Sequence, residues 1–162
     1  MTEARSPSAI RACVGAEPVA DEGRRLLADG LGPDALGKPL PPLKGRRPVK
    51  LALMDQSVVA GLGNVQAMEA LWRAGIHPTT PCDALDDAAR ARLNDAVHAQ
   101  LADTLALLGD GDTITYVDES LASNPFPIYR RAGTPCPRCG SPIARIVLGG
   151  RGTYFCPRCQ PS

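Results

Sequence analysis

Cys136-Pro-Arg-Cys139 and Cys156-Pro-Arg-Cys159, two copies of one motif, decide the fold of the last quarter of this 162-residue chain. Sixteen residues separate them, and this spacing is a strong signal for a metal site with four cysteine ligands. Thiolates from Cys136, Cys139, Cys156 and Cys159 would surround one Zn²⁺ ion in a closed tetrahedral shell. Such a shell leaves no open position for catalysis, so the predicted role of the zinc is structural.

The alternative interpretation of these cysteines is a pair of disulfides in a small secreted protein. The remaining cysteines, Cys13 and Cys82, stand alone, and no stretch of the chain resembles a signal peptide. We therefore expect a zinc site in a reducing compartment, the cytoplasm of a bacterium.

The residues between the two motifs predict a β-hairpin. Ile143–Leu148 and Thr153–Phe155 are rich in β-branched and aromatic residues, and Gly149-Gly-Arg-Gly152 joins them. The zinc ion would hold one end of this hairpin, and Arg151 would project at the glycine-rich tip. Residues 121–162 are too few to form a core of their own, so we expect a four-cysteine zinc finger that depends on the metal.

The middle of the chain predicts helices. Asp83–Leu108 carries an apolar stripe at steps of mostly four residues, with Asp83 as its N-cap. A shorter helix is predicted to begin with Asn64 as its N-cap and to end at Gly75. The predicted fold is therefore mainly α with a small β-hairpin zinc finger. No run of residues approaches the length and apolarity of a membrane span.

Composition divides the chain into three parts. Residues 1–30 lack a sustained hydrophobic period, and we expect them to form a poorly ordered N-terminal arm. Residues 31–120 form the expected helical domain, and residues 121–162 form the finger.

Charge is segregated along the chain, although the formal net charge is only +1. Residues 38–50 hold five basic residues and no acidic one, and residues 121–162 hold six arginines and no acidic residue. Residues 83–119 carry nine acidic residues against two arginines. The pattern indicates either a face offered to a polyanion or a solvated helix between two basic loops, and charge alone favours neither.

Four stretches carry a resemblance to a known family: Met54-Asp-Gln-Ser-Val-Val-Ala-Gly-Leu-Gly-Asn64, Glu69-Ala-Leu-Trp-Arg-Ala-Gly-Ile-His-Pro78, Tyr129-Arg-Arg-Ala-Gly-Thr-Pro-Cys136 and Arg151-Gly-Thr-Tyr-Phe-Cys156. Together they resemble the formamidopyrimidine-DNA glycosylase and endonuclease VIII family, from about Leu31 to Gln160. The resemblance implies a helix-two-turn-helix DNA-binding domain over residues 31–120, followed by the zinc finger. In that family these two parts grip kinked duplex DNA, with the damaged nucleotide turned out of the stack.

The resemblance also implies a set of DNA-binding residues. Asn64 would hold a phosphate beside the lesion, helped by backbone amides at its helix N-terminus. Lys50 would contact a nearby phosphate, and Arg151 would clasp the phosphate of the damaged nucleotide. From the residues alone, a local helix cap is the preferred interpretation of Asn64, and a solvated turn residue that of Arg151. The resemblance favours the phosphate contacts.

The sequence also departs from the family pattern. Gln66 stands where the family usually has an aromatic residue, and Arg130 stands where it usually has glycine. The family's N-terminal β-sandwich, whose terminal proline amine attacks the sugar C1′, has no counterpart in this sequence, which begins Met1-Thr2-Glu3. Thr2 and Glu3 remain as candidates for imine chemistry at an abasic site, but an amine on a disordered arm is not held near C1′.

The leading hypothesis is a zinc-containing protein that binds damaged or abasic double-stranded DNA in the bacterial cytoplasm, in association with the nucleoid. It would be inactive alone or would work with a separate catalytic chain. One alternative is an active or fragmentary DNA glycosylase and abasic-site lyase that uses an N-terminal amine. The other is a zinc-ribbon interaction module without DNA binding.

Overall fold

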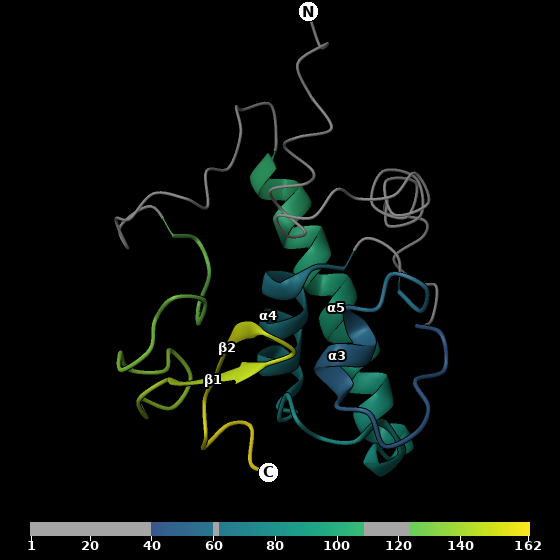
Figure 1. Cartoon of the computed structure of the whole chain (residues 1–162). Helices are drawn as coiled ribbons and strands as arrows, with labels where there is room; N and C mark the ends of the chain where they lie inside the picture. The colour runs from purple at the N-terminus through teal and green to yellow at the C-terminus, as the bar shows by residue number, and fades with distance from the viewer. Residues whose placement is uncertain (1–39, 60–61, 109–123) are drawn as a thin grey trace, which may run out of the picture.

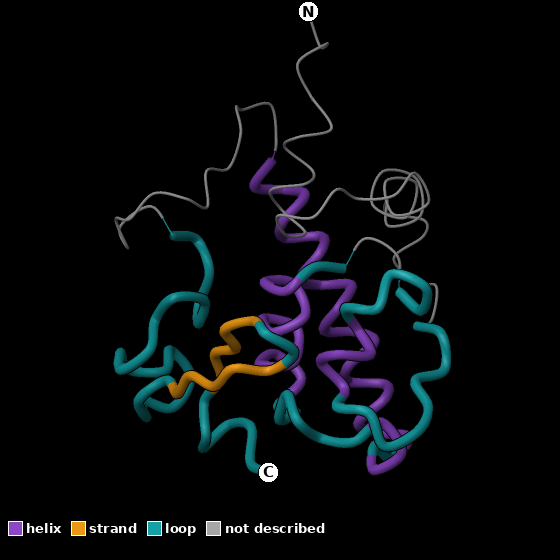
Figure 2. The backbone as a smooth tube through the Cα atoms, in the orientation of Figure 1, coloured by secondary structure: helices purple, strands orange, loops and turns teal. Residues whose placement is uncertain are grey.

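The computed structural model describes residues 40–59, 62–108 and 124–162 (Figure 1). The expected N-terminal arm, with Thr2 and Glu3, lies outside the described residues. The elements in chain order are α3 (Val49–Leu53), α4 (Asn64–Ala74), the short 3₁₀ helix η3 (Cys82–Ala84), α5 (Asp87–Leu108), β1 (Ala144–Leu148) and β2 (Arg151–Phe155). Figure 2 shows that helices dominate the described chain and that one hairpin accompanies them, as predicted. No helix in these described ranges could cross a membrane, given their length and polarity.

Helix α4 is the centre of the packing. On one side it packs along α5, where Leu71 meets the fully buried Leu93 and Val97 in the main hydrophobic cluster. On another side it contacts β2, and its Met68 and Trp72 belong to a second cluster shared with the finger. Because α4 is covered from both sides, the buried side chains of Gln66 and Glu69 need hydrogen-bond partners within the protein.

The N-terminus of α4 differs from the prediction. Gly63 is the N-cap residue, and Asn64 is already the first residue of the helix. The Asn64 amide Nδ2 instead donates to the carbonyl O of Gly152 at 3.2 Å, a partner 88 positions away in the chain. The C-terminus agrees with the prediction, since Gly75 ends the helix with a left-handed φ of 69°.

Helix α5 begins later than the prediction. It starts at Asp87, directly after Asp86, whose Oδ1 accepts the backbone N–H of Ala89 at 2.7 Å and so caps the helix. The predicted cap, Asp83, lies in η3. Leu85 separates the two helices because its backbone is extended, with φ −77° and ψ 118°.

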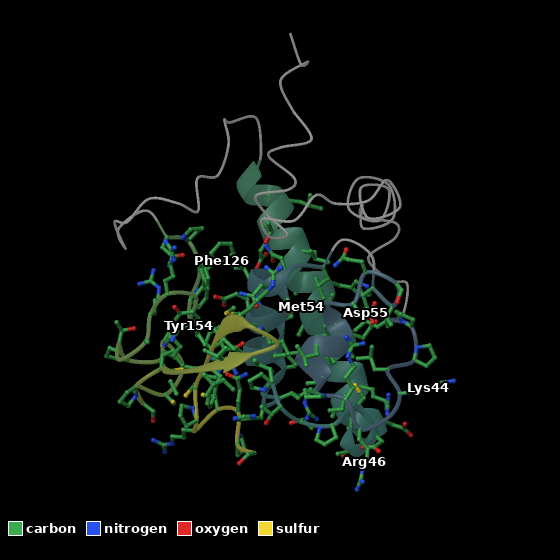
Figure 3. All side chains as sticks on the ribbon, viewed as in Figure 1. Lys44, Arg46, Met54, Asp55, Phe126 and Tyr154 are labelled. Carbon is green, nitrogen blue, oxygen red and sulfur yellow. The ribbon has the colours of Figure 1, made fainter. Side chains whose placement is uncertain are left out.

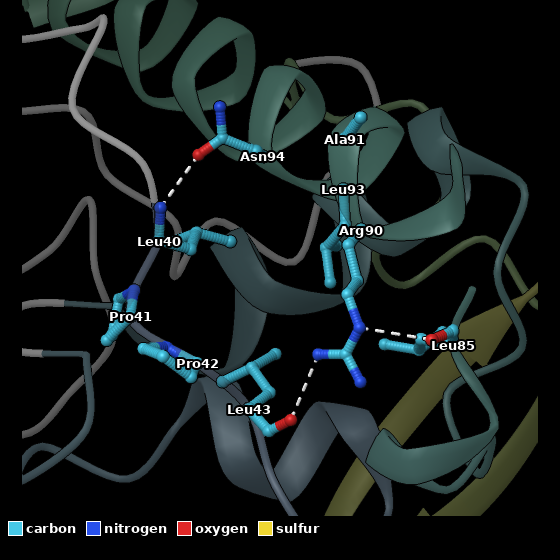
Figure 4. Close-up of a pocket in the computed structure, with 9 residues that line it drawn as sticks. All are labelled: Leu40, Pro41, Pro42, Leu43, Leu85, Arg90, Ala91, Leu93 and Asn94. Carbon is cyan, nitrogen blue, oxygen red and sulfur yellow. Dashed lines mark hydrogen bonds between the residues drawn. The ribbon is translucent and has the colours of Figure 1, made fainter. Parts of the chain in front are cut away.

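Arg90 of α5 holds the loop before α3 against this helix (Figure 4). Its guanidinium donates to the carbonyl O of Leu43 and of Leu85, at 3.0 Å in both cases. Nearby, Asn94 Oδ1 accepts the backbone N–H of Leu40 at 2.8 Å. Arg90 and Asn94 of α5 together therefore fix the two ends of the segment 40–43.

Strands β1 and β2 pair antiparallel, which confirms the predicted hairpin. Gly149 and Gly150 form its turn with φ values of 62° and 75°, the left-handed values that a two-residue type I′ turn requires. A Cβ on Gly149 would lie 2.6 Å from Cδ2 of Leu51, so the tip of the hairpin packs closely on the Leu51 side chain of α3. Arg151 follows the turn as the first residue of β2 and pairs with Leu148.

Candidate metal centre and nucleic-acid interface

The four predicted cysteine ligands come together at the end of the hairpin opposite its tip. Their sulfur atoms all lie within 4.8 Å of one another, with 3.9 Å between Cys136 and Cys159 and 3.4 Å between Cys139 and Cys156. A tetrahedral zinc ion with Zn–S bonds of about 2.3 Å needs sulfur atoms about 3.8 Å apart. The donor set and the spacing therefore fit a structural Zn²⁺ ion.

The first cysteine pair is attached to α4 through Trp72. The indole Nε1 donates to Cys136 Sγ at 3.4 Å. Arg138, from the same motif, lies over the indole ring at 4.5 Å and donates to the Trp72 carbonyl O at 3.0 Å. The structure thus places Trp72 against a metal ligand.

The second cysteine pair is attached to the end of α4 through Gln160. Its Oε1 accepts the backbone N–H of Cys156 at 2.8 Å, and its Nε2 donates to the carbonyl O of Ile76 at 2.9 Å. The first motif is thus bonded to α4 itself, and the second is bonded through Gln160 to Ile76, which follows the C-cap residue Gly75. Metal binding and the position of α4 are therefore coupled.

The three predicted DNA-binding residues meet around the start of β2. Lys50 of α3 donates from Nζ to Thr153 Oγ1 at 2.6 Å, and Asn64 of α4 donates to the carbonyl O of Gly152. Arg151 precedes these two β2 residues in the chain. A lysine, a helix N-terminus and a hairpin arginine from distant parts of the sequence thus form one cluster, which we call the Lys50–Asn64–Arg151 cluster.

This cluster is strongly cationic. Burial, and next the positive charge of Arg151, lower the pKa of Lys50 from 10.5 to about 8. The first turn of α4 contains no acidic residue to neutralise the positive end of its helix dipole. An anion placed here would relieve the repulsion between Lys50 and Arg151 and would meet the helix N-terminus.

The Asn64 side chain has unused hydrogen-bonding capacity within the described residues. Its Oδ1 is buried without a partner there, and only one of its two amide hydrogens is needed for the bond to Gly152. Buried polar groups are nearly always paired in native proteins, so Oδ1 calls for a donor such as a water. The second amide hydrogen is the part of this side chain that a phosphate oxygen could accept.

The basic stretch before α3 does not form one surface. Lys50 is directed inward to the hairpin, whereas Lys44 and Arg46 are exposed and lie away from it (Figure 3). Arg47 pairs with Asp55, with Nη1 and Oδ2 2.6 Å apart. Among the lysines and arginines of residues 44–50, Lys50 alone therefore belongs to the cluster.

Glu69 joins α4 to the segment that leads into the finger. Its Oε1 accepts the backbone N–H groups of Ile128 at 3.1 Å and Tyr129 at 2.9 Å. Burial raises the pKa of this carboxyl from 4.5 to about 7, and the two backbone bonds oppose that shift. Sequence reasoning missed this role, although a carboxylate among the apolar residues of α4 was a signal that it needed a buried partner.

Gln66, a departure from the family pattern, belongs to a buried polar group between α4 and α5. Its Oε1 accepts from Gln100 Nε2 at 2.9 Å and lies 3.0 Å from Thr104 Oγ1. All three side chains are buried. The glutamine is thus matched by two polar residues of α5.

A family model described as the formamidopyrimidine-DNA glycosylase H2TH domain matches residues 31–121, which is more than half of the chain. The chain belongs to the formamidopyrimidine-DNA glycosylase family. A second model, described as a zinc finger found in FPG and IleRS, matches residues 133–161. The four cysteines of this glycosylase-family chain are therefore its zinc-finger site, and the predicted order of helical part and finger is confirmed.

Relatives and solved structures extend this result. The formamidopyrimidine-DNA glycosylase of Ligilactobacillus salivarius is 47% identical over 71% of this chain and 43% of the relative. That of Geobacillus kaustophilus is 39% identical over 88% of this chain and 53% of the relative. The chain spans about half the length of the curated relatives it matches.

Two glycosylase structures with DNA are similar to this chain. The complex between Lactococcus lactis Fpg and DNA containing an abasic site gives a TM-score of 0.64 and 31% identity, over 85% of this chain and 48% of that one. MutM in complex with DNA that contains carbocyclic 8-oxo-G gives a TM-score of 0.62 and 36% identity, over 72% of this chain and 42% of that one.

Proposed function

We propose that this chain binds damaged or abasic double-stranded DNA through backbone phosphates. The observation that carries the proposal is the convergence of Lys50, Asn64 and Arg151 around β2, beside the N-terminus of α4. The similar structures of Lactococcus lactis Fpg with abasic-site DNA and of MutM with 8-oxo-G DNA support the choice of ligand.

Each member of the cluster suits a phosphate in a different way. The Arg151 guanidinium can present two N–H donors to two phosphate oxygens, and Lys50 adds a compact positive charge. Asn64 adds an amide donor next to the first backbone N–H groups of α4. These contacts are independent of base identity, so they would position the duplex and leave lesion choice to other groups.

The zinc ion serves this contact by keeping the hairpin rigid. The metal would hold one end of β1 and β2, while Gly149 seats the other end on Leu51 of α3. Arg151 is thus fixed before DNA arrives, and less conformational entropy is lost on binding.

We assign residues 31–120 to the DNA-binding helical domain and residues 121–162 to the finger, and we assign DNA binding rather than catalysis to both. Among the described residues, the lysine amine of the cluster is Lys50 Nζ, which is buried and bonded to Thr153. It is therefore not placed to attack a sugar C1′. Catalysis at the bound lesion would be supplied by groups outside these two parts, and the protein would act at the bacterial nucleoid.

A titration of the protein against intact and abasic-analogue duplexes, at several salt concentrations, tests this function. We expect binding that weakens steeply with salt, because phosphate contacts release condensed cations, and that is tighter for the abasic analogue. Arg151→Ala should weaken it, whereas Arg158→Ala, which removes an exposed arginine near the zinc end, should have little effect. Absence of salt-dependent binding by the unaltered protein would leave the zinc-ribbon interaction module as the better hypothesis.

A further inference from the structure

Arg130 has an unusual backbone conformation. Its φ of 59° is the only positive φ at a residue other than glycine in the described ranges. The left-handed region brings a side chain close to its own backbone, so it normally selects glycine. Residues held there against this preference cluster at functional sites, where the surrounding structure fixes them.

The surroundings of Arg130 do impose this conformation. Glu69 accepts the backbone N–H of Tyr129 at 2.9 Å on one side. Arg131 on the other side donates its backbone N–H to the carbonyl O of Ile128 at 3.1 Å. The backbone is therefore held on both sides of Arg130, while its own side chain is exposed.

An aromatic row supports the Arg130 side chain. The guanidinium lies 5.6 Å from the centre of the Tyr129 ring, within the range of a cation–π contact. Tyr129 in turn makes edge contacts with Tyr154 at 5.9 Å and with Phe126 at 6.1 Å. Phe126 and Tyr154 lie on the same side of the molecule (Figure 3). The Arg130 guanidinium thus packs on a row of three aromatic side chains, which we call the aromatic support.

This support lies on the other face of the hairpin from the Lys50–Asn64–Arg151 cluster. Side chains alternate along a strand, so Tyr154 points away from the face on which Thr153 receives Lys50. Arg145, which pairs with Tyr154 across the hairpin, adds a second exposed arginine to the Tyr154 face. Residues 121–162 contain no acidic residue that could neutralise these charges.

We infer that Arg130 is a further DNA-binding residue, which contacts a phosphate of the same duplex distinct from the one at the Lys50–Asn64–Arg151 cluster. The inference rests on the proposed DNA binding. An exposed, positively charged side chain in a segment without acidic residues is complementary to a polyanion, and its fixed backbone reduces the entropy lost on binding. The unfavourable φ at this position is then maintained for contact with DNA.

The test is Arg130→Gly, because a structural role and a binding role predict different combinations of results. Glycine accepts the left-handed φ, so the Tm should rise by roughly 1 to 3 °C. Affinity for the abasic-analogue duplex should nevertheless fall roughly three- to tenfold, and the slope of log K against log salt should become shallower by about one. Arg130→Lys should keep the original salt slope, and Arg158→Ala should leave both slope and affinity nearly unchanged.

Unchanged affinity and slope in Arg130→Gly would overturn the inference, whatever the Tm. A lowered Tm would also overturn it, because the arginine would then serve the fold. If Arg151→Ala weakens binding and Arg130→Gly does not, the inference fails while the proposed function stands. If the unaltered protein shows no salt-dependent binding, both fail.

Discussion

Lys50 combines a buried position with a positive charge, and its pKa of about 8 is the consequence. Burial and the charge of Arg151 both favour the neutral amine in the free protein. A bound phosphate would favour the ammonium instead, so DNA binding should be accompanied by proton uptake when the pH is above 8. The contribution of Lys50 to DNA binding can therefore be measured from the pH dependence of the affinity.

We expect DNA affinity at constant salt to be flat below about pH 7.5 and to fall by up to about tenfold per pH unit above pH 8.5. The sign follows from the lowered pKa, because the free protein loses the Lys50 proton as the pH rises and binding must restore it. Lys50→Met should bind more weakly at neutral pH and lack this decline. An equal decline in Lys50→Met would assign the titration to another group.

Arg151 and Asn64 should each contribute to phosphate binding. Arg151→Ala removes a two-donor contact, and we expect it to cost about 1 to 3 kcal/mol of binding free energy. Asn64→Asp keeps the size of the side chain but places a carboxylate at the helix N-terminus, where it would repel the phosphate, so its loss should be at least as large. Gel-shift titrations measure both variants, and unchanged affinity in both would remove the cluster from the DNA interface.

Among the elements, α4 connects the parts of the molecule. Asn64 bonds to the hairpin, Gln66 to α5, Glu69 to the segment before the finger, and Trp72 to a cysteine ligand. Each of these partners is more than thirty positions away in the chain. A single helix of eleven residues thus sets the position of the metal centre relative to the Lys50–Asn64–Arg151 cluster.

The Glu69 carboxyl should make stability depend on pH. Its folded-state pKa is raised from 4.5 to about 7, so the folded protein holds this proton more tightly than the unfolded chain. The resulting stabilisation is complete below pH 4.5 and is lost as the pH rises through 7, by roughly 3 kcal/mol in total. Glu69→Gln keeps an oxygen for the two backbone N–H groups and should remove this dependence.

Urea unfolding at constant zinc, between about pH 5 and pH 8, measures the effect of Glu69. The difference in unfolding free energy between the unaltered protein and Glu69→Gln should grow as the pH rises from 5 to about 7 and level off above that. A difference that stays constant would contradict a raised pKa in the folded state.

Removal of zinc should unfold the finger first. With a chelator, or in Cys156→Ser, the backbone amides of β1 and β2 should lose protection from hydrogen exchange, because the hairpin has no other covalent or metal restraint. Amides of α5 serve as the internal control and should remain protected longer. Cys82→Ala, which removes a thiol outside the site, should keep one zinc ion per chain by mass spectrometry.

Short-range patterns predicted the local features well. The paired cysteine motifs, the glycine-rich hairpin and the end of α4 at Gly75 each depend on neighbouring residues, and the structure has all of them. The predicted connection Gly149–Gly152 was too long, because Arg151 and Gly152 already belong to β2. The cap of α4 was predicted wrongly because Asn64 bonds to Gly152, far along the chain. No sequence pattern pairs Lys50 with Thr153 or Trp72 with Cys136, so the contacts that assemble the cluster and the metal support could not be predicted.

At the scale of the whole molecule, helix α5 and the acid-free finger both pack against α4. Several acidic side chains of α5 are exposed, and the acid-free finger lies on the other side of α4. A duplex that approaches the finger would therefore meet arginines and avoid the acidic helix. It is the packing on α4 that decides which side of the molecule carries the acidic residues of α5 and which side carries the arginines of the finger.

Binding without covalent chemistry is the expected behaviour of the whole chain. Incubation with an abasic duplex and borohydride should give no trapped adduct, although the same duplex is bound, because Lys50 Nζ is buried at the interface. The same duplex and borohydride incubated with a full-length glycosylase of the family provide the positive control. A trapped adduct that disappears when the N-terminal amine is blocked would instead establish imine chemistry through Thr2.

Trp72 gives the molecule an intrinsic optical reporter. It is the only tryptophan in the chain, and its indole Nε1 lies 3.4 Å from Cys136 Sγ. Indole fluorescence is sensitive to a neighbouring sulfur and to solvent, so emission from the unlabelled protein should follow metal occupancy of the finger. The same signal, recorded during a DNA titration at limiting zinc, would show whether DNA binding increases the affinity of the finger for zinc.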